Sequence, residues 1–97
     1  MLCIEYVVTM YYWADTIIPY EIIETGKVMI IIYNMLGQHV KTMLNEEQNP
    51  GAYKVIWDGR DNAGMGVANG IYVYRVSFKD QVITKSMLKL EWEIIIR

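Results

Sequence analysis

The feature that most constrains the fold is a two-residue alternation of side chains within short runs. Runs of 6–10 residues rich in Ile, Val, Tyr and Trp are separated by Gly, Asn, Asp and Pro, and none shows the 3.6-residue period of an amphipathic helix. The turn signals between them are Thr25-Gly26, Leu36-Gly37, Asn49-Pro50-Gly51, Asp58-Gly59, Asn62-Ala63-Gly64, Asn69-Gly70 and Lys79-Asp80. Short strands with turns at this spacing predict an all-β sandwich or barrel.

The alternation also divides the side chains of each run between two faces, as in an antiparallel sandwich with one buried face per sheet. Pro19 cannot donate to a ladder and indicates that its strand lies at an edge, whereas the weaker run from Gln38 to Leu44 has no certain phase. The sets that share a face are Ile18, Tyr20 and Ile22; Val28, Ile30 and Ile32; Tyr53, Val55 and Trp57, which we expect to point inward; Tyr72, Tyr74, Val76 and Phe78; and Ile83, Lys85, Met87 and Lys89.

Two turns have specific mechanisms. In Asn49-Pro50-Gly51, Pro50 sets φ at the first central position, and Gly51 supplies the positive φ that a type II turn requires at the second. Asn69-Gly70 suits a turn in which both central residues have positive φ, directly before an aromatic strand.

The polar stretch from Asp58 to Gly66 is the candidate for chemistry. A calcium loop needs oxygen ligands at alternate positions, but Arg60 stands where the second ligand would be. Asp58 and Asp61 stand three residues apart in a Gly-rich turn, where we expect both carboxylates to be solvated and unsuited to acid–base work. No helix follows that would complete a phosphate cradle. We therefore interpret Asp58 and Gly59 as structural turn residues and expect no enzyme activity, metal or cofactor.

Composition excludes further classes of function. The 97 residues suffice for one domain, and the net charge of −2 comes without the clustered cations that nucleic-acid binding needs. Cys3 is the only cysteine, and the single His39 is more typical of a solvated side chain than of a ligand. Residues 1–15 lack the basic region and cleavage site of a signal peptide and are too short to span a bilayer.

Residues 16–90 resemble a known family: the immunoglobulin-like domain of the flagellar hook-capping protein and, still more, the C-terminal sorting domains of the type IX secretion system. The shared pattern includes an I-x-Y-x-L strand, I-Y-N-x-L-G-Q, W-D-G-R and G-I-Y-x-Y-R, in order and with family-like spacing. The matching positions are Ile18, Tyr20 and Ile22; Gly26 to Val40; Gly51 to Arg60; Asn62 and Gly64; Val67 to Arg75; and Thr84, Lys85, Met87 and Leu90.

The resemblance implies an immunoglobulin-like antiparallel sandwich of about seven strands, in which Tyr72 serves as a corner tyrosine or as plain core packing. Trp57 would be a core residue whose indole N–H finds a backbone acceptor. It further implies a module at the end of a large exported cargo protein, covalently linked to the cargo domain upstream. The outer-membrane secretion machinery would recognise it, deliver it to the cell surface or the medium and, in many relatives, cleave it off.

By the same resemblance, recognition lies in the last two strands, with Lys85 and Lys89 forming a cationic stripe on the outward face of the final strand or merely keeping an edge strand soluble. The residues implied in recognition are Gly70, Tyr72, Tyr74, Arg75, Lys85, Met87 and Lys89. No nucleic acid or small-molecule substrate is expected.

We divide the chain into an N-terminal extension or linker remnant at 1–15, a sandwich at 16–91 and a C-terminal extension at 92–97. Met29 and Ile31 stand where the family is commonly polar, which indicates a face covered by the N-terminal segment or used for docking. Two alternatives to sorting are a purely structural immunoglobulin-like module and a carbohydrate-binding sandwich with exposed aromatic side chains.

Overall fold

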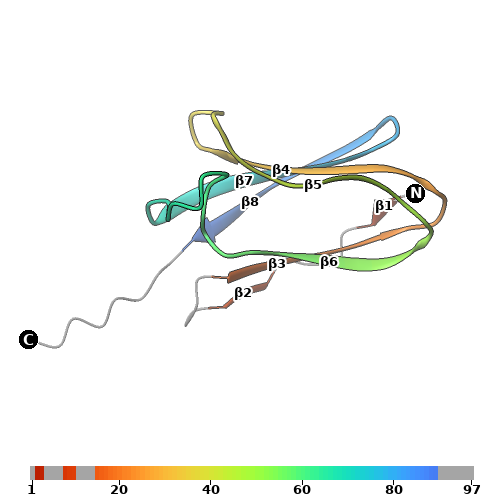
Figure 1. Ribbon diagram of the computed structural model, residues 1–97, viewed down its shortest axis with the longest axis horizontal. Helices are drawn as coiled ribbons and strands as arrows, with labels where there is room; N and C mark the ends of the chain where they lie inside the picture. Colours follow the sequence, from red (N-terminus) through yellow and green to blue (C-terminus); the bar gives the residue numbers. More distant parts are fainter. Residues whose placement is uncertain (1, 4–7, 11–14, 90–97) are drawn as a thin grey trace, which may run out of the picture.

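The computed structural model describes residues 2–3, 8–10 and 15–89, which form two antiparallel sheets packed face to face (Figure 1). In the first, the β3 sheet, β3 (Asp15–Ile22) pairs on one side with β6 (Gly51–Trp57) and on the other with the short strands β1 (Leu2–Cys3) and β2 (Val8–Met10). The second, the β4 sheet, has the order β5-β4-β7-β8, with bounds β4 (Gly26–Asn34), β5 (His39–Gln48), β7 (Gly70–Phe78) and β8 (Gln81–Lys89).

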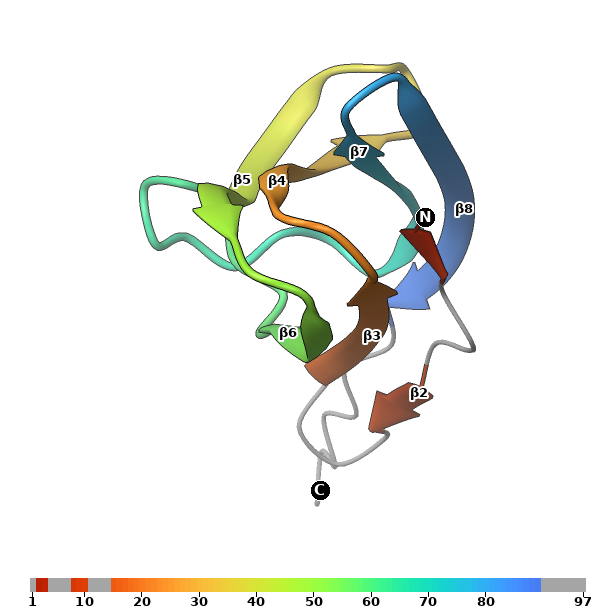
Figure 2. The same cartoon turned by 90° about the vertical axis from the view of Figure 1, so that its right-hand side faces the viewer.

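The predicted all-β sandwich is therefore confirmed, although six strands, β3 to β8, rather than seven build the main body of the described part. The view in Figure 2 looks along the sandwich and shows β3 and β6 on one side of the interior and β4, β5, β7 and β8 on the other. None of the described residues forms a helix long and apolar enough to cross a membrane.

The core lies between the sheets and is built from the inward phases that the alternation predicts. Its buried apolar side chains are Ile18, Tyr20, Ile22, Val28, Ile30, Ile32, Val40, Trp57, Tyr72, Tyr74, Val76, Phe78 and Met87. The register of β5 against β4 shifts at two places, between Ile30 and Ile31 and between Ile32 and Tyr33. Because each irregularity changes which β5 residues point inward, the run from Gln38 to Leu44 shows no single phase in the sequence.

The edge position expected for the strand of Pro19 is wrong. β3 has neighbours on both sides, with Pro19 opposite Lys54 of β6. On the other side, the described pairing involves residues 15–17 with β2 and residues 21–22 with β1. On the side of β1 and β2, Pro19 thus falls between the two short ladders, opposite none of the described residues of β1 or β2.

Two turn predictions are also wrong. Gly51 has no positive φ; it begins β6 and pairs with Ile22, because the chain crosses here from the β4 sheet to the β3 sheet and does not reverse in a hairpin. At Asn69-Gly70 only Gly70 has a positive φ, of 151°. This segment leads from the long loop after β6 into β7, so it too lies outside a tight hairpin.

Candidate interaction surface

The polar loop between β6 and β7 uses its acidic side chains to bond its own backbone. Asp58 Oδ1 accepts a hydrogen bond from the Arg60 N–H at 3.1 Å, and Asp61 Oδ1 accepts from the N–H groups of Ala63 and Met65 at 3.0 and 2.9 Å. Gly59 has φ 78°, which glycine adopts without steric cost. The interpretation of Asp58 and Gly59 as turn residues is therefore confirmed. Within the described residues, no three His, Cys, Asp or Glu side chains are arranged to hold a metal ion.

Two buried aromatic side chains fasten this loop to the sandwich. The indole N–H of Trp57 donates to the Arg60 carbonyl at 2.9 Å, and the Tyr72 hydroxyl donates to the Ala68 carbonyl at 2.6 Å. The two rings meet edge to face, 5.2 Å between centroids. The backbone acceptor expected for Trp57 and the corner-tyrosine role of Tyr72 are both confirmed.

The loop is also docked on β5 by Asn62, a contact between residues far apart in the sequence. Its N–H donates to the Val40 carbonyl and its Oδ1 accepts from the Thr42 N–H, both at 3.2 Å. The sequence marked Asn62 only as a turn residue, because nothing local shows that β5 passes beside it.

The residues implied in recognition do not share one surface. Tyr72, Tyr74 and Met87 belong to the core, and Gly70 is half-buried at the start of β7. The Tyr74 hydroxyl has no hydrogen-bond partner among the described residues, and burial raises the pKa of Tyr74 to about 12. These inward side chains hold the fold and are not available to a partner.

The outward position expected for Lys89 is wrong. Lys89 shares the inward phase of Met87 and is only 2% exposed. Its ammonium group donates to the Val67 carbonyl, and its aliphatic stem lies so close to Gly59 that a Cβ there would be 2.6 Å from Lys89 Cε. The stem packs on the loop while the ammonium finds a polar partner, so Lys89 fastens β8 to the loop and forms no outward stripe with Lys85.

The two recognition residues that remain exposed, Arg75 and Lys85, lie on opposite faces of the β4 sheet. Arg75 is opposite Thr84, and Lys85 is opposite the buried Tyr74. A partner lying flat against one face of this sheet therefore contacts one of these cations and not the other.

The face of the β4 sheet turned away from the core, here called the outer face, is unusually apolar. Its members are Lys27, Met29, Ile31 and Tyr33 of β4, His39, Thr42, Asn45 and Glu47 of β5, Ile71, Val73, Arg75 and Ser77 of β7, and Val82, Thr84, Ser86 and Leu88 of β8. Ile71 and Leu88 pair with each other and are 48% and 46% exposed. The described N-terminal residues pair with β3 in the other sheet, so they do not cover this face as one interpretation of Met29 and Ile31 proposed.

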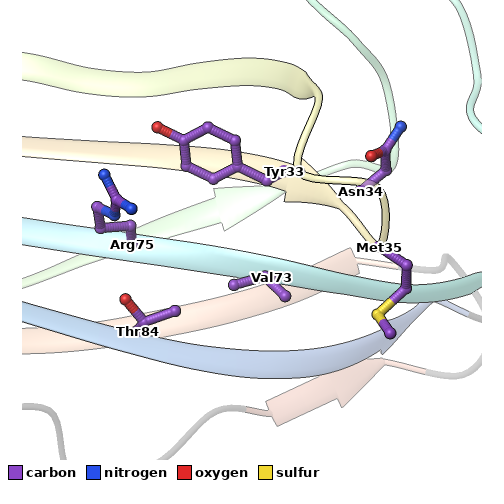
Figure 3. A pocket seen from close by; sticks show the side chains of 7 residues that line it. Tyr33, Asn34, Met35, Val73, Arg75 and Thr84 are labelled. Carbon is purple, nitrogen blue, oxygen red and sulfur yellow. The ribbon is translucent and has the colours of Figure 1, made fainter.

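One end of the outer face is hollowed beside the β4–β5 turn (Figure 3). The hollow has a volume of about 250 Å³ and is lined by Tyr33, Asn34, Met35, Gly37, Val73, Arg75 and Thr84. The Arg75 guanidinium carbon lies 5.4 Å from the centre of the Tyr33 ring, and the His39 ring meets the same tyrosine at its edge, 6.3 Å between centroids. Tyr33 thus holds Arg75 in place by a cation–π contact.

The turn at this end is rigidly built. Asn34 Oδ1 accepts hydrogen bonds from the N–H groups of Leu36 and Gln38, and Gly37 adopts φ 79° between them. The turn carries Met35 and Leu36, which are 65% and 83% exposed. A fixed turn therefore presents apolar side chains next to the hollow.

Comparison with known proteins identifies the family of this fold. No curated protein matches the chain. Among solved structures, the crystal structure of dimeric latent PorU from Porphyromonas gingivalis contains a similar fold, with a TM-score of 0.65 at 18% identity. The match covers 89% of this chain but only 9% of that one. The family model of the FlgD Ig-like domain matches residues 23–81, more than half of the sequence, which confirms the immunoglobulin-like class. The chain therefore belongs to the FlgD Ig-like domain family.

Proposed function

We propose that this domain is a non-catalytic sorting module, which directs a covalently linked cargo protein through the type IX secretion system for export or attachment to the cell surface. The outer-membrane secretion machinery is the partner in this proposal. The module acts through contacts of its folded surface and needs no cofactor.

The observation that carries the proposal is the ordered set of sequence motifs from Ile18 to Leu90, which resembles the sorting domains along most of the chain. The structure supports a role through contacts, because Asp58 and Asp61 bond turn backbone and the main sandwich closes its core within residues 15–89. The solved PorU chain, of which the match covers 9%, is an example of this fold as a small part of a much longer chain.

The test is an export assay in a bacterium with an intact type IX pathway. The 97-residue chain is fused to the C-terminus of a periplasmic reporter, and reporter outside the cells is compared between the wild type and a strain that lacks the pathway. We expect extracellular reporter only in the wild type. Equal amounts in the two strains would contradict the sorting role.

A matched pair of variants tests whether the secretion machinery recognises β8. Lys85→Glu reverses an exposed charge on β8, and Lys54→Glu makes the same change at an exposed position of β6 in the other sheet. We expect Lys85→Glu to reduce export and Lys54→Glu to leave it unchanged. Equal effects of the two variants on export would show that Lys85 of β8 is not part of the recognition surface.

The second candidate is a structural immunoglobulin-like module that contributes only contacts within a larger assembly. The family match favours it, because residues 23–81 match the FlgD Ig-like domain. In the export assay, this role predicts that the folded fusion stays in the periplasm of both strains.

A further inference from the structure

The inference begins with Arg75, an exposed cation on the outer face that has no acidic partner in the described part of the chain. The ion pairs there are Lys41 with Asp58, Arg60 with Asp58, and Lys79 with Glu24. The carboxylate of the outer face, Glu47 of β5, lies opposite Lys27 of β4, four residues along β4 from Ile31, the residue that pairs with Arg75. The guanidinium is held over the Tyr33 ring, so its N–H groups are positioned in advance while its charge remains unneutralised.

Thr84 adds a second donor beside this charge. It lies directly opposite Arg75 in the β7–β8 ladder and is exposed. In Figure 3 its hydroxyl oxygen points to the side on which Arg75 lies. A guanidinium and a hydroxyl next to each other suit a carboxylate, whose oxygens accept several hydrogen bonds.

The apolar part of the hollow lies at a spacing that fits an extended chain. Val73 is two residues from Arg75 on β7, so both side chains emerge on the outer face about 7 Å apart. Met35, which is carried by the β4–β5 turn, lines the same hollow and lies on the side of Val73 away from Arg75 (Figure 3). A peptide in extended conformation places its residues i and i+2 on one face at the same spacing, which allows an acidic residue at i and an aliphatic residue at i+2 to engage Arg75 and Val73 together.

We infer that the outer face binds an extended acidic peptide segment of a partner protein. One Asp or Glu carboxylate contacts Arg75 and Thr84, and the aliphatic side chain two residues away enters the hollow at Met35 and Val73. The inference is independent of the sorting role, since peptide binding is measured without export.

The experiment is a titration of the ¹⁵N-labelled 97-residue protein with the blocked peptide acetyl-Leu-Ser-Glu-Ser-Leu-amide, followed by amide chemical shifts. We expect saturable shifts confined to residues 33–37, 73–75 and 84, with millimolar affinity. The same peptide with Gln in place of Glu is expected to bind at least about fivefold more weakly, because it loses the charge-assisted hydrogen bonds. Acetyl-Ser-Ser-Glu-Ser-Ser-amide is expected to weaken binding similarly by leaving the hollow empty.

Variants locate the contact. Arg75→Gln is expected to weaken binding of the Glu peptide at least about fivefold, whereas Arg60→Gln, which removes another exposed arginine, from the loop between β6 and β7, leaves it within about twofold. Both variants are checked for the wild-type pattern of amide shifts before titration. Equal binding of the Glu and Gln peptides, equal loss in both variants, or shifts spread away from the hollow would each overturn the inference.

Discussion

The hydroxyl of Tyr74 allows a test of how much a buried polar group without a hydrogen-bond partner costs in folding free energy. Tyr74 is fully buried, and its hydroxyl has no hydrogen-bond partner among the described residues. Tyr72, two residues earlier on the same strand, has a hydroxyl that donates to the Ala68 carbonyl. The two tyrosine-to-phenylalanine changes remove the same atom from neighbouring inward positions, so they isolate the effect of the hydrogen bond.

We predict opposite signs for the two changes. A buried polar group without a partner costs about 1–3 kcal/mol of folding free energy, while removing one oxygen also loses some packing, so Tyr74→Phe is expected to stabilise the domain by about 1 kcal/mol. Tyr72→Phe is expected to destabilise it by about 1 kcal/mol, because a hydrogen bond is lost and exposed Ala68 can recover water. For a domain of this size, 1 kcal/mol corresponds to about 4–8 °C in Tm.

The assay is urea unfolding at pH 7, with both variants compared with the wild type at equal m-value. Stabilisation by Tyr74→Phe together with destabilisation by Tyr72→Phe supports the reasoning. A loss of 1 kcal/mol or more in Tyr74→Phe would refute it, because the hydroxyl would then have a partner that stabilises the fold.

Alkaline pH provides a second readout of the same residue. Burial raises the pKa of Tyr74 to about 12, whereas the unfolded chain ionises near the ordinary value of 10. Between these values the unfolded state loses its proton first, so stability falls as pH rises, by at most about 1.4 kcal/mol per pH unit for this group. Burial also raises the pKa values of Tyr20 and Tyr72. The advantage of Tyr74→Phe over the wild type should therefore widen between pH 10 and 12, and a constant difference would contradict the buried hydroxyl.

Three further predictions concern the loop after β6 and are checked by urea unfolding. Gly59→Ala should cost about 1–2 kcal/mol, because φ is 78° there and the new Cβ would meet the Lys89 stem, and a neutral result would contradict that contact. Trp57→Phe should cost about 2–3 kcal/mol through a void and the lost bond to the Arg60 carbonyl, whereas a change under 1 kcal/mol would show that the indole is not anchored. Asp61→Ala should cost about 1–2 kcal/mol by leaving two N–H groups without their acceptor, and an unchanged midpoint would show that water replaces it.

The inward faces of most strands were predictable because they depend on a local property. Side chains alternate with a period of two, so the pattern within each strand is enough to show that Ile18 and Ile30 point inward. The corner tyrosine was predictable for a similar reason, since Tyr72 and its acceptor Ala68 are four residues apart.

The features that the sequence did not predict depend on neighbours brought by the fold. Lys89 looked like an outward cation because its partners, the Val67 carbonyl and the space above Gly59, lie in a different part of the chain. Pro19 looked like an edge residue because the sequence pattern did not predict β1 and β2, the short strands that pair with β3 on that side. Gly51 looked like a hairpin residue because nothing local shows that the chain changes sheets at that point.

Buried and exposed residues of this domain also differ in what their substitution tests, folding stability or recognition. Inward side chains such as Tyr74 and Lys89 are committed to the core and the loop, so substitutions there change the amount of folded protein and report on binding only indirectly. Arg75 and Lys85 are exposed on opposite faces of one sheet. A charge change at either should therefore leave stability nearly unchanged while it probes a different face. Loss of export in Lys85→Glu combined with loss of peptide binding in Arg75→Gln would mean that the domain uses both faces for different partners.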